Sequence, residues 1–197
     1  MNILVIGAGG VGASMASIAE TRSIFTQFVL ADISLSRAEE AIAQLDDRSK
    51  FVAEQVDARD MTAIKALIQK VKADVVVNAC DPRMNEPIFN AAYEAHCNYI
   101  DMAMNLSEPH ASNPYEEVGS PLGADQLAAD QAWRDRGLLA LLAWELSQDS
   151  VMCLLAMQPT TCSTPLMKSV CATGRTCQLT ALTLLRHFLF GQPLKSV

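Results

Sequence analysis

Residues 2–12 constrain the fold of this chain more than any other segment. Four apolar residues, ILVI, run directly into Gly7, Gly9 and Gly12, which follow the pattern G-x-G-x-x-G. A strand this apolar is typical of a parallel sheet covered by helices on both faces. The first glycine of the pattern makes a tight turn, the second lets the backbone approach a pyrophosphate, and the third lets the next helix lie close to the strand. The segment therefore predicts the opening unit of a dinucleotide-binding domain.

Strand-like and helix-like patterns alternate along the next 130 residues or so. The further strands are expected at 27–31, 50–56, 74–79, 98–102 and 138–142. The helices are expected at 13–20, 35–45, 60–71, 86–96 and 124–136, and a loop rich in Pro and Gly at 108–123. Ser34 can cap the N-terminus of the helix at 35–45. Such alternation predicts an α/β fold, a doubly wound parallel sheet with right-handed crossovers (a Rossmann fold).

The acidic residue after the second expected strand is a candidate cofactor ligand. Asp32 can accept hydrogen bonds from both hydroxyls of an adenosine ribose, and its charge would repel a 2′-phosphate, which favours NAD. Arg37 could instead neutralise such a phosphate or stack on adenine, and it is equally compatible with a solvated helix position. The choice between NAD and NADP therefore stays open.

Three further strand ends carry candidate ligands. Asp57 follows the third strand and can bind the exocyclic amine of an adenine or cap a turn. The fourth strand ends in Asn78-Ala79-Cys80, where the nicotinamide half of a dinucleotide should lie, and Asp101 ends the fifth. We interpret Cys80 as a small residue packed at a strand end and not as a nucleophile.

The composition excludes several classes of partner. The net charge is −7, whereas nucleic acids and anionic membranes attract basic patches. No apolar run reaches the roughly 18 residues of a membrane span, and a strand beginning at residue 2 leaves no room for a signal peptide. The six cysteines form no C-x-x-C pair and are expected to stay reduced. We expect a cytoplasmic protein with no metal site, no nucleic-acid partner and no membrane contact.

Several segments, loops included, resemble the NAD(P)-binding domain of the saccharopine dehydrogenase family. They are NILVIGAGGVG, ADISLSRAEEAI, VVVNACDPR, NYIDMAMNLSEPH and PYEEVG. The resemblance covers Met1 to about Leu142. It implies an oxidoreductase of amino acids or their imine adducts, which joins or splits a secondary amine with NAD or NADP as cofactor. A small-molecule amino-acid substrate is implied, and no catalytic residue is identified.

The resemblance also implies a role for individual residues. The glycine turn would hold the pyrophosphate, and the end of the second strand would bind the adenosine ribose. The end of the third strand would bind the adenine, and the end of the fourth would bind the nicotinamide ribose. The implied cofactor-binding residues are Gly7, Ala8, Gly9, Gly10, Val11, Gly12, Asp32, Ile33, Arg37, Asp57, Ala58, Asn78, Ala79 and Cys80.

Two other classes share the glycine pattern. A nucleotide-sensing regulatory module without catalysis is the main alternative, since fold alone cannot exclude it. Against it stands the segment Tyr99–His110, which resembles the oxidoreductases. A short-chain dehydrogenase or epimerase is excluded, because no tyrosine is followed by lysine in the spacing Y-x-x-x-K.

The sequence changes character near residue 143. Residues 1–142 hold 11 basic and 20 acidic side chains, whereas residues 143–197 hold 4 and 2, with four of the six cysteines. Family members continue after the sixth strand with a segment of the type LGMGVEPG, but this chain reads LAWELSQD. One coding of these residues, CTG GCA TGG GAG TTG AGC CAG GAC, yields the family segment when one G is inserted after the first codon. Residues 177–189 can be back-translated and shifted in the same way to give a sequence that resembles the substrate domain of the family. We therefore interpret residues 143–197 as the product of a one-nucleotide frameshift.

Two parts are therefore expected. Residues 1–142 form the NAD(P)-binding domain, and residues 143–197 are an aberrant tail, irregular or poorly ordered, in place of the substrate domain. Such a chain would be truncated and possibly inactive, and its exposed sheet flank would favour self-association, for example as a homodimer. The alternative is a genuine short extension in which residues 179–190 form an amphipathic helix.

Overall fold

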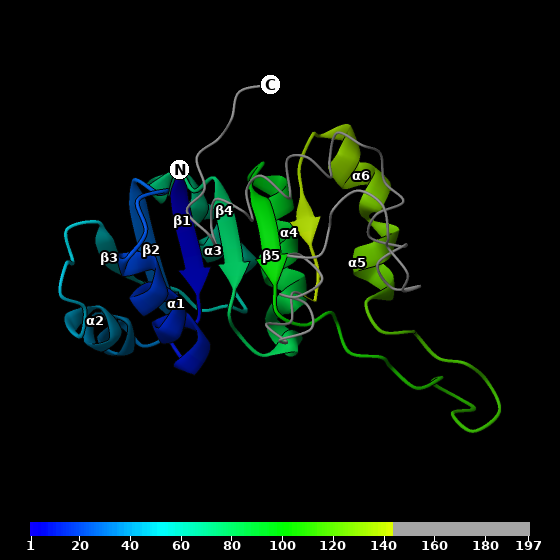
Figure 1. Cartoon of the computed structure of the whole chain (residues 1–197). Coiled ribbons are helices and arrows are strands. Elements are labelled where there is room, and N and C mark those ends of the chain that lie inside the picture. The colour runs from blue at the N-terminus through cyan, green and yellow to red at the C-terminus, as the bar shows by residue number, and fades with distance from the viewer. Residues whose placement is uncertain (144–197) are drawn as a thin grey trace, which may run out of the picture. The chain divides into compact units, whose positions relative to one another are not determined.

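A six-stranded parallel sheet is the centre of the fold, as the computed structural model of the chain shows for residues 1–143, the part that it describes (Figure 1). The strands are β1 (Asn2–Ile6), β2 (Gln27–Asp32), β3 (Phe51–Gln55), β4 (Val75–Asn78), β5 (Asn98–Asp101) and β6 (Ala140–Leu141). They lie in the order β3-β2-β1-β4-β5-β6, and every neighbouring pair is parallel. The predicted doubly wound fold is confirmed.

The helices cover both faces of this sheet. They are α1 (Gly10–Glu20), α2 (Leu35–Ala43), α3 (Met61–Val71), α4 (Asn85–Glu94), α5 (Ala124–Ala128) and α6 (Asp130–Asp135), with a 3-10 turn η1 at Pro82–Met84. Figure 1 shows α1 and α2 on one face, and α3 and α4 on the other. The single helix expected over 124–136 is divided at Ala129 into α5 and α6.

The alternation of side chains along the strands explains this double cover. Leu4 and Ile6 of β1 belong to one buried apolar cluster with residues of α3 and α4, among them Ile64 and Ile88. Successive side chains of a strand point to opposite faces, so the residues between them face α1 and α2. Because both faces are covered, nearly every residue of the central strands is apolar.

An aromatic cluster fixes the β6 side of the domain. The ring of Trp133, from α6, lies 4.8 Å from that of Phe89 and 6.4 Å from that of Tyr99, measured between centroids. Phe89 and Tyr99 also meet edge to face at 5.2 Å. These contacts hold the short helix α6 against α4 and β5, although α6 itself has fewer than two turns.

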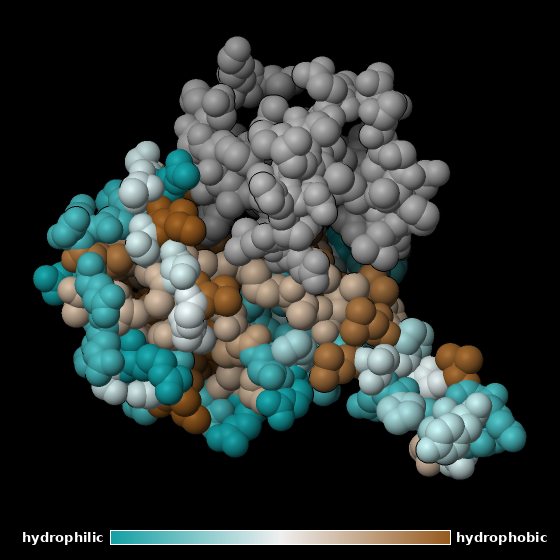
Figure 2. Space-filling view, turned by 60° about the horizontal axis from the view of Figure 1, so that its bottom comes forward, coloured by the Kyte–Doolittle hydropathy of each residue, from teal (hydrophilic) through white to brown (hydrophobic). Residues whose placement is uncertain are grey.

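The strand order reverses between β1 and β4, and the crevice at such a point is where open α/β sheets bind ligands. Figure 2 looks obliquely toward the carboxyl ends of the strands and shows moderately hydrophobic residues across the middle of this face. Residues 105–123 form a long arm that projects from the same end of the sheet (Figure 1). The arm includes the loop expected over 108–123 and begins three residues earlier. The N–H of Gly123 donates to the carbonyl of Asn105 (2.9 Å) and closes the arm at its base.

Several expectations concern residues beyond this part of the chain. The irregular tail expected over 143–197 lies outside the described residues except for residue 143, and so does the whole of the alternative amphipathic helix at 179–190. Within residues 1–143, no helix is long and apolar enough to cross a membrane.

Ala143 has an unusual backbone conformation. Its φ is +52°, in the left-handed region that favours glycine, and its N–H donates to the Asp101 carboxylate (2.7 Å). An L-residue with a Cβ loses about 1–2 kcal/mol in this region. Lys72 and His96 also have positive φ, but both follow the end of a helix, where this conformation is common.

Replacing Ala143 by glycine should therefore raise the free energy of unfolding by about 0.5–1 kcal/mol, because the relieved strain exceeds the flexibility that a glycine adds to the unfolded chain. Chemical denaturation of both proteins measures the change. The control is Ala129→Gly, at a φ of −77°, where the same replacement should destabilise the protein. A loss of stability at both positions would contradict left-handed strain at Ala143.

Candidate cofactor site

The turn between β1 and α1 places its glycines in two different environments. Gly7 has a φ of +107°, and a Cβ there would lie 2.8 Å from the carbonyl oxygen of Ala79. A Cβ on Gly12 would overlap the carbonyl oxygen of Gly7. By contrast, a Cβ on Gly9 or Gly10 would meet no atom within 4 Å. The first and third glycines of the pattern thus serve backbone packing, whereas the second borders open space.

Helix α1 begins directly at this open turn. Gly9 occupies its N-cap position, and no side chain caps the helix there. The first N–H groups of a helix lack partners within it and carry the positive end of its dipole. Open space next to such a terminus suits a pyrophosphate. Val11, in the first turn, is 44% exposed and lies in the same segment.

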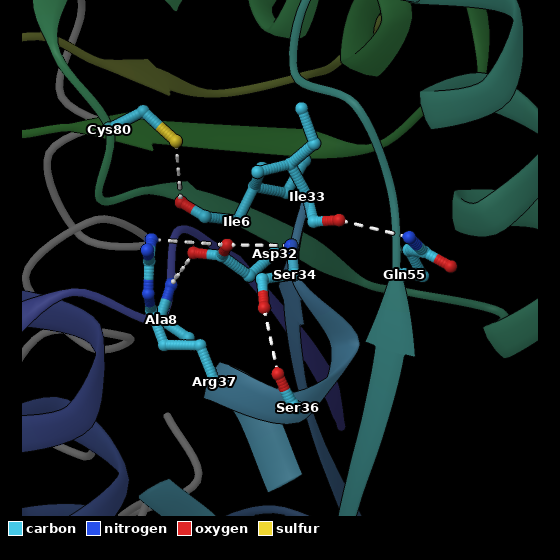
Figure 3. Close-up of polar contacts among 9 residues, drawn as sticks. All are labelled: Ile6, Ala8, Asp32, Ile33, Ser34, Ser36, Arg37, Gln55 and Cys80. Carbon is cyan, nitrogen blue, oxygen red and sulfur yellow. Dashed lines mark hydrogen bonds and ion pairs between the residues drawn. The ribbon is translucent and has the colours of Figure 1, made fainter. Parts of the chain in front are cut away.

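Asp32 at the end of β2 is buried and holds the surrounding backbone (Figure 3). One of its carboxylate oxygens accepts the N–H of Ala8, in the glycine turn, at 2.8 Å. The other accepts the N–H of Ser34 at 3.0 Å. A single side chain therefore joins the turn after β1 to the turn after β2, two segments that a dinucleotide would contact together.

The turn after β2 carries a second layer of polar groups. Nη1 of Arg37 lies 3.4 Å from the Asp32 carboxylate, but its side chain is 58% exposed. Ser34 lies at the N-cap of α2, as expected, yet its hydroxyl caps nothing and instead contacts the hydroxyl of Ser36 at 2.9 Å. Ile33 precedes Ser34 in the same turn and is 53% exposed, and its side chain points away from Ser34, Ser36 and Arg37 (Figure 3).

The end of β3 is occupied by local pairs. Asp57 accepts the backbone N–H of Arg59 and a bidentate pair of bonds from its guanidinium, and these hold the pKa of the Asp57 carboxyl at about 2. The turn-capping role considered for Asp57 is therefore present, and its adenine contact stays a prediction, as does that of Ala58. Gln55 donates to the carbonyl of Ile33 (2.9 Å), a link between β3 and the turn after β2 that the sequence did not indicate.

The turn after β4 lies against the glycine turn. The side-chain oxygen of Asn78 accepts the N–H of Cys80 (2.9 Å), and the Cys80 thiol donates to the carbonyl of Ile6 (3.3 Å). Burial, followed by the charges of Asp32 and Asp81, raises the pKa of this thiol to about 11. Cys80 is therefore protonated near neutral pH, in agreement with a packing role.

The predicted residues thus fall into two groups. Those of the turns after β1, β2 and β4 lie together at the strand ends (Figure 3), whereas Asp57 and Ala58 lie at the end of the edge strand β3. Ser34 and Ser36 are additional polar groups beside the candidate site. The two serines next to Arg37 in the segment SLSR are the sequence feature that could have indicated them. Within residues 1–143, no three His, Cys, Asp or Glu side chains gather in a way that could hold a metal ion.

Comparison with known proteins agrees with this geometry. Residues 3–141 match the family model described as "Saccharopine dehydrogenase NADP binding domain". The chain belongs to this family. As a saccharopine dehydrogenase NADP-binding domain, it binds a nicotinamide dinucleotide, NAD or NADP, and the open glycine turn beside a helix N-terminus and a buried carboxylate fits that group.

Individual relatives of the saccharopine dehydrogenase domain are similar over part of their length. The carboxynorspermidine synthase of Vibrio cholerae serotype O1 is 34% identical over 114 residues, which are 54% of this chain and 28% of that protein. The carboxyaminopropylagmatine dehydrogenase of a Synechocystis species is 27% identical over 140 residues, 71% of this chain and 33% of that protein. The chain therefore matches about a third or less of these relatives.

A solved structure shares the fold. The apo saccharopine dehydrogenase (L-Glu forming) from Saccharomyces cerevisiae superposes with a TM-score of 0.55 at 13% identity, covering 79% of this chain and 29% of that one.

The two kinds of glycine should respond differently to alanine. Gly9→Ala is expected to leave the melting temperature unchanged, because its φ of −73° and the open space both admit a Cβ. The affinity for NADPH should nevertheless fall at least about tenfold, because the Cβ would occupy the space of the pyrophosphate. Gly12→Ala should instead destabilise the fold, by roughly 1–3 kcal/mol or more. Thermal unfolding and calorimetric titration of both variants provide the measurements, and an unchanged affinity in Gly9→Ala would place the pyrophosphate elsewhere.

Proposed function

We propose that this chain is the cofactor-binding part of an NAD(P)-dependent oxidoreductase that acts on an amino acid or on the imine adduct of one. The observation that carries the proposal is the open glycine turn beside buried Asp32, in a chain of the saccharopine dehydrogenase family. The relatives' names, which describe carboxylated amines, support a substrate with both an amine and a carboxylate. The reaction would make or cleave a secondary amine.

The work of the domain in such a reaction is to bind and orient. A bound nicotinamide dinucleotide supplies the hydride chemistry. The first turn of α1 would bind the pyrophosphate, the turn after β2 the adenosine ribose, and Asn78-Ala79-Cys80 the nicotinamide ribose. Because the Cys80 thiol is held protonated, we expect it to serve neither as a nucleophile nor as a general base.

The surroundings of Asp32 support NADP as the preferred cofactor. Both of its oxygens accept backbone N–H groups, and the Arg37 guanidinium partly compensates its charge. Arg37 stays largely exposed and can bind a 2′-phosphate through a planar pair of N–H groups. The hydroxyls of Ser34 and Ser36, 2.9 Å apart, add donors on the same turn.

Arg37→Ala should then separate the two cofactors. The affinity for NADPH is expected to fall about 10- to 100-fold, as for the loss of a charge-assisted hydrogen bond, while the affinity for NADH changes little. Calorimetric titration with each cofactor measures both. Arg48→Ala is the control, because it removes the same charge from an exposed position between α2 and β3. Equal losses for NADPH and NADH would contradict a 2′-phosphate contact.

We also propose that residues 143–197 are read from a shifted frame. In the family-like segment LGMGVEPG, the residue at position 143 becomes glycine. The φ of +52° at Ala143 supports the shift independently of any codon choice, because this conformation favours glycine. On this proposal the substrate domain is replaced, and the chain binds cofactor without turning over a substrate.

The genomic DNA across codon 143 tests the frame directly. One added nucleotide should open a frame that encodes LGMGVEPG and runs on beyond the length of the present tail. A stop codon soon after this segment would contradict the proposal. At the protein level, the 197-residue chain should bind NADPH in calorimetry without substrate-dependent oxidation or reduction, and the chain with the restored frame should regain turnover.

The same pair of proteins separates the enzyme from its main alternative. Robust turnover by the chain as given would contradict the frame proposal. A restored chain that binds the cofactor but turns over no amino acid or imine adduct would instead favour a nucleotide-sensing module.

A further inference from the structure

Buried polar side chains gather beneath the carboxyl ends of β4 and β5. Within residues 1–143, five polar or charged side chains are buried, and one of them is Asp32. The other four come from β4, the start of α4, the end of β5 and α5. Together with the fully buried Tyr99 they form the β4–β5 polar cluster: Asn78, Asn85, Tyr99, Asp101 and Gln126.

One end of this cluster fixes the turn after β4. Nδ2 of Asn78 donates to Oδ1 of Asn85 (2.7 Å) and to the hydroxyl of Tyr99 (3.2 Å). The oxygen of the same amide accepts the N–H of Cys80 (2.9 Å). Every part of the Asn78 amide is therefore bonded, and its orientation, on which the Cys80 bond depends, is set from beneath by Asn85 and Tyr99.

The other end of the cluster fixes the base of the arm. Burial, followed by the charge of the neighbouring Asp101 carboxylate, raises the pKa of the Tyr99 hydroxyl. The Asp101 carboxylate accepts Nε2 of Gln126 (2.8 Å). Oε1 of Gln126 in turn accepts the N–H of Asn105 (2.8 Å), the first residue of the arm. Burial raises the pKa of Asp101, whereas the bonds to this carboxylate lower it. Two sets of hydrogen bonds, one at the turn after β4 and one at the base of the arm, thus meet where the Tyr99 hydroxyl lies beside the Asp101 carboxylate.

The turn after β4 is also in contact with the glycine turn. A Cβ on Gly7 would lie 2.8 Å from the carbonyl oxygen of Ala79, so the two turns are packed closely together. A shift of the Ala79 peptide would therefore move the backbone on which a bound dinucleotide rests. In a doubly wound sheet the nicotinamide half lies on this side of the switch point, and the adenosine half lies over β2. Asn85, Tyr99 and Gln126 are buried, so they can act on a ligand only through Asn78 and the turn after β4.

We propose that Tyr99, Asn85 and Gln126 are positioning residues, which act through Asn78 and the turn after β4 to hold the nicotinamide half of the cofactor in place. The inference rests on the proposed cofactor site. A core held by apolar side chains would stabilise the same strands without dictating the orientation of the Asn78 amide. A polar network in which every member is bonded specifies one arrangement of its side chains. Removing one member leaves buried partners without hydrogen bonds, which costs stability.

The experiment compares the whole cofactor with a fragment that lacks the nicotinamide half. Tyr99→Phe and Gln126→Met in the full chain are titrated with NADPH and with adenosine 2′,5′-bisphosphate by calorimetry. NADPH should bind each variant about 10-fold more weakly than it binds the wild type. The fragment should bind all proteins within about twofold, since the contacts of the adenosine half are intact. Tyr93→Phe is the matched control, because its hydroxyl lies outside the cluster.

The outcomes separate this proposal from the one that it rests on. If the wild type binds neither ligand, the proposed cofactor site is wrong. If it binds both, and the two variants lose affinity for NADPH and fragment equally, or for neither, the positioning role is overturned. Melting temperatures identify a variant that does not fold. Gln126→Met then decides alone, because it lies at the far end of the cluster and leaves the Tyr99 ring packing intact.

Discussion

The contact between the first turn and the first helix is the constraint on which the rest of this structure depends. A Cβ at Gly12 would overlap the carbonyl oxygen of Gly7, so α1 can lie against β1 only if that position has no side chain. Because α1 is held there, its N-terminus opens at the crevice between β1 and β4. The position of the proposed pyrophosphate site is thus a consequence of backbone packing.

Two buried carboxylates organise the two halves of the carboxyl edge. Asp32 joins the glycine turn to the turn after β2, and Asp101 joins β5 to α5 and to the chain after β6. Each accepts backbone N–H groups, which compensates the cost of burying a charge. The proposed adenosine side and the proposed nicotinamide side of the site are therefore held by separate carboxylates, and a change in one need not disturb the other.

The sequence predicted the strands, their parallel arrangement in a doubly wound sheet and the glycine turn, because each depends on local apolar runs or on residues without side chains. It did not predict the pairing of Gln126 with Asp101, which are 25 residues apart and joined only by the fold. Ser34 shows a subtler limit, since its N-cap position was predicted correctly while its hydroxyl found Ser36 instead of the helix. Contacts between segments require the three-dimensional arrangement, whereas the elements themselves do not.

The hydrogen bond between Asp101 and Ala143, just after β6, does not depend on the side chain at position 143. The carboxylate accepts a main-chain N–H, which every amino acid except proline can offer. The contact at the end of the sheet can therefore form with any residue except proline at position 143. It is available to the alanine of this chain and equally to the glycine that the shifted reading frame would encode there.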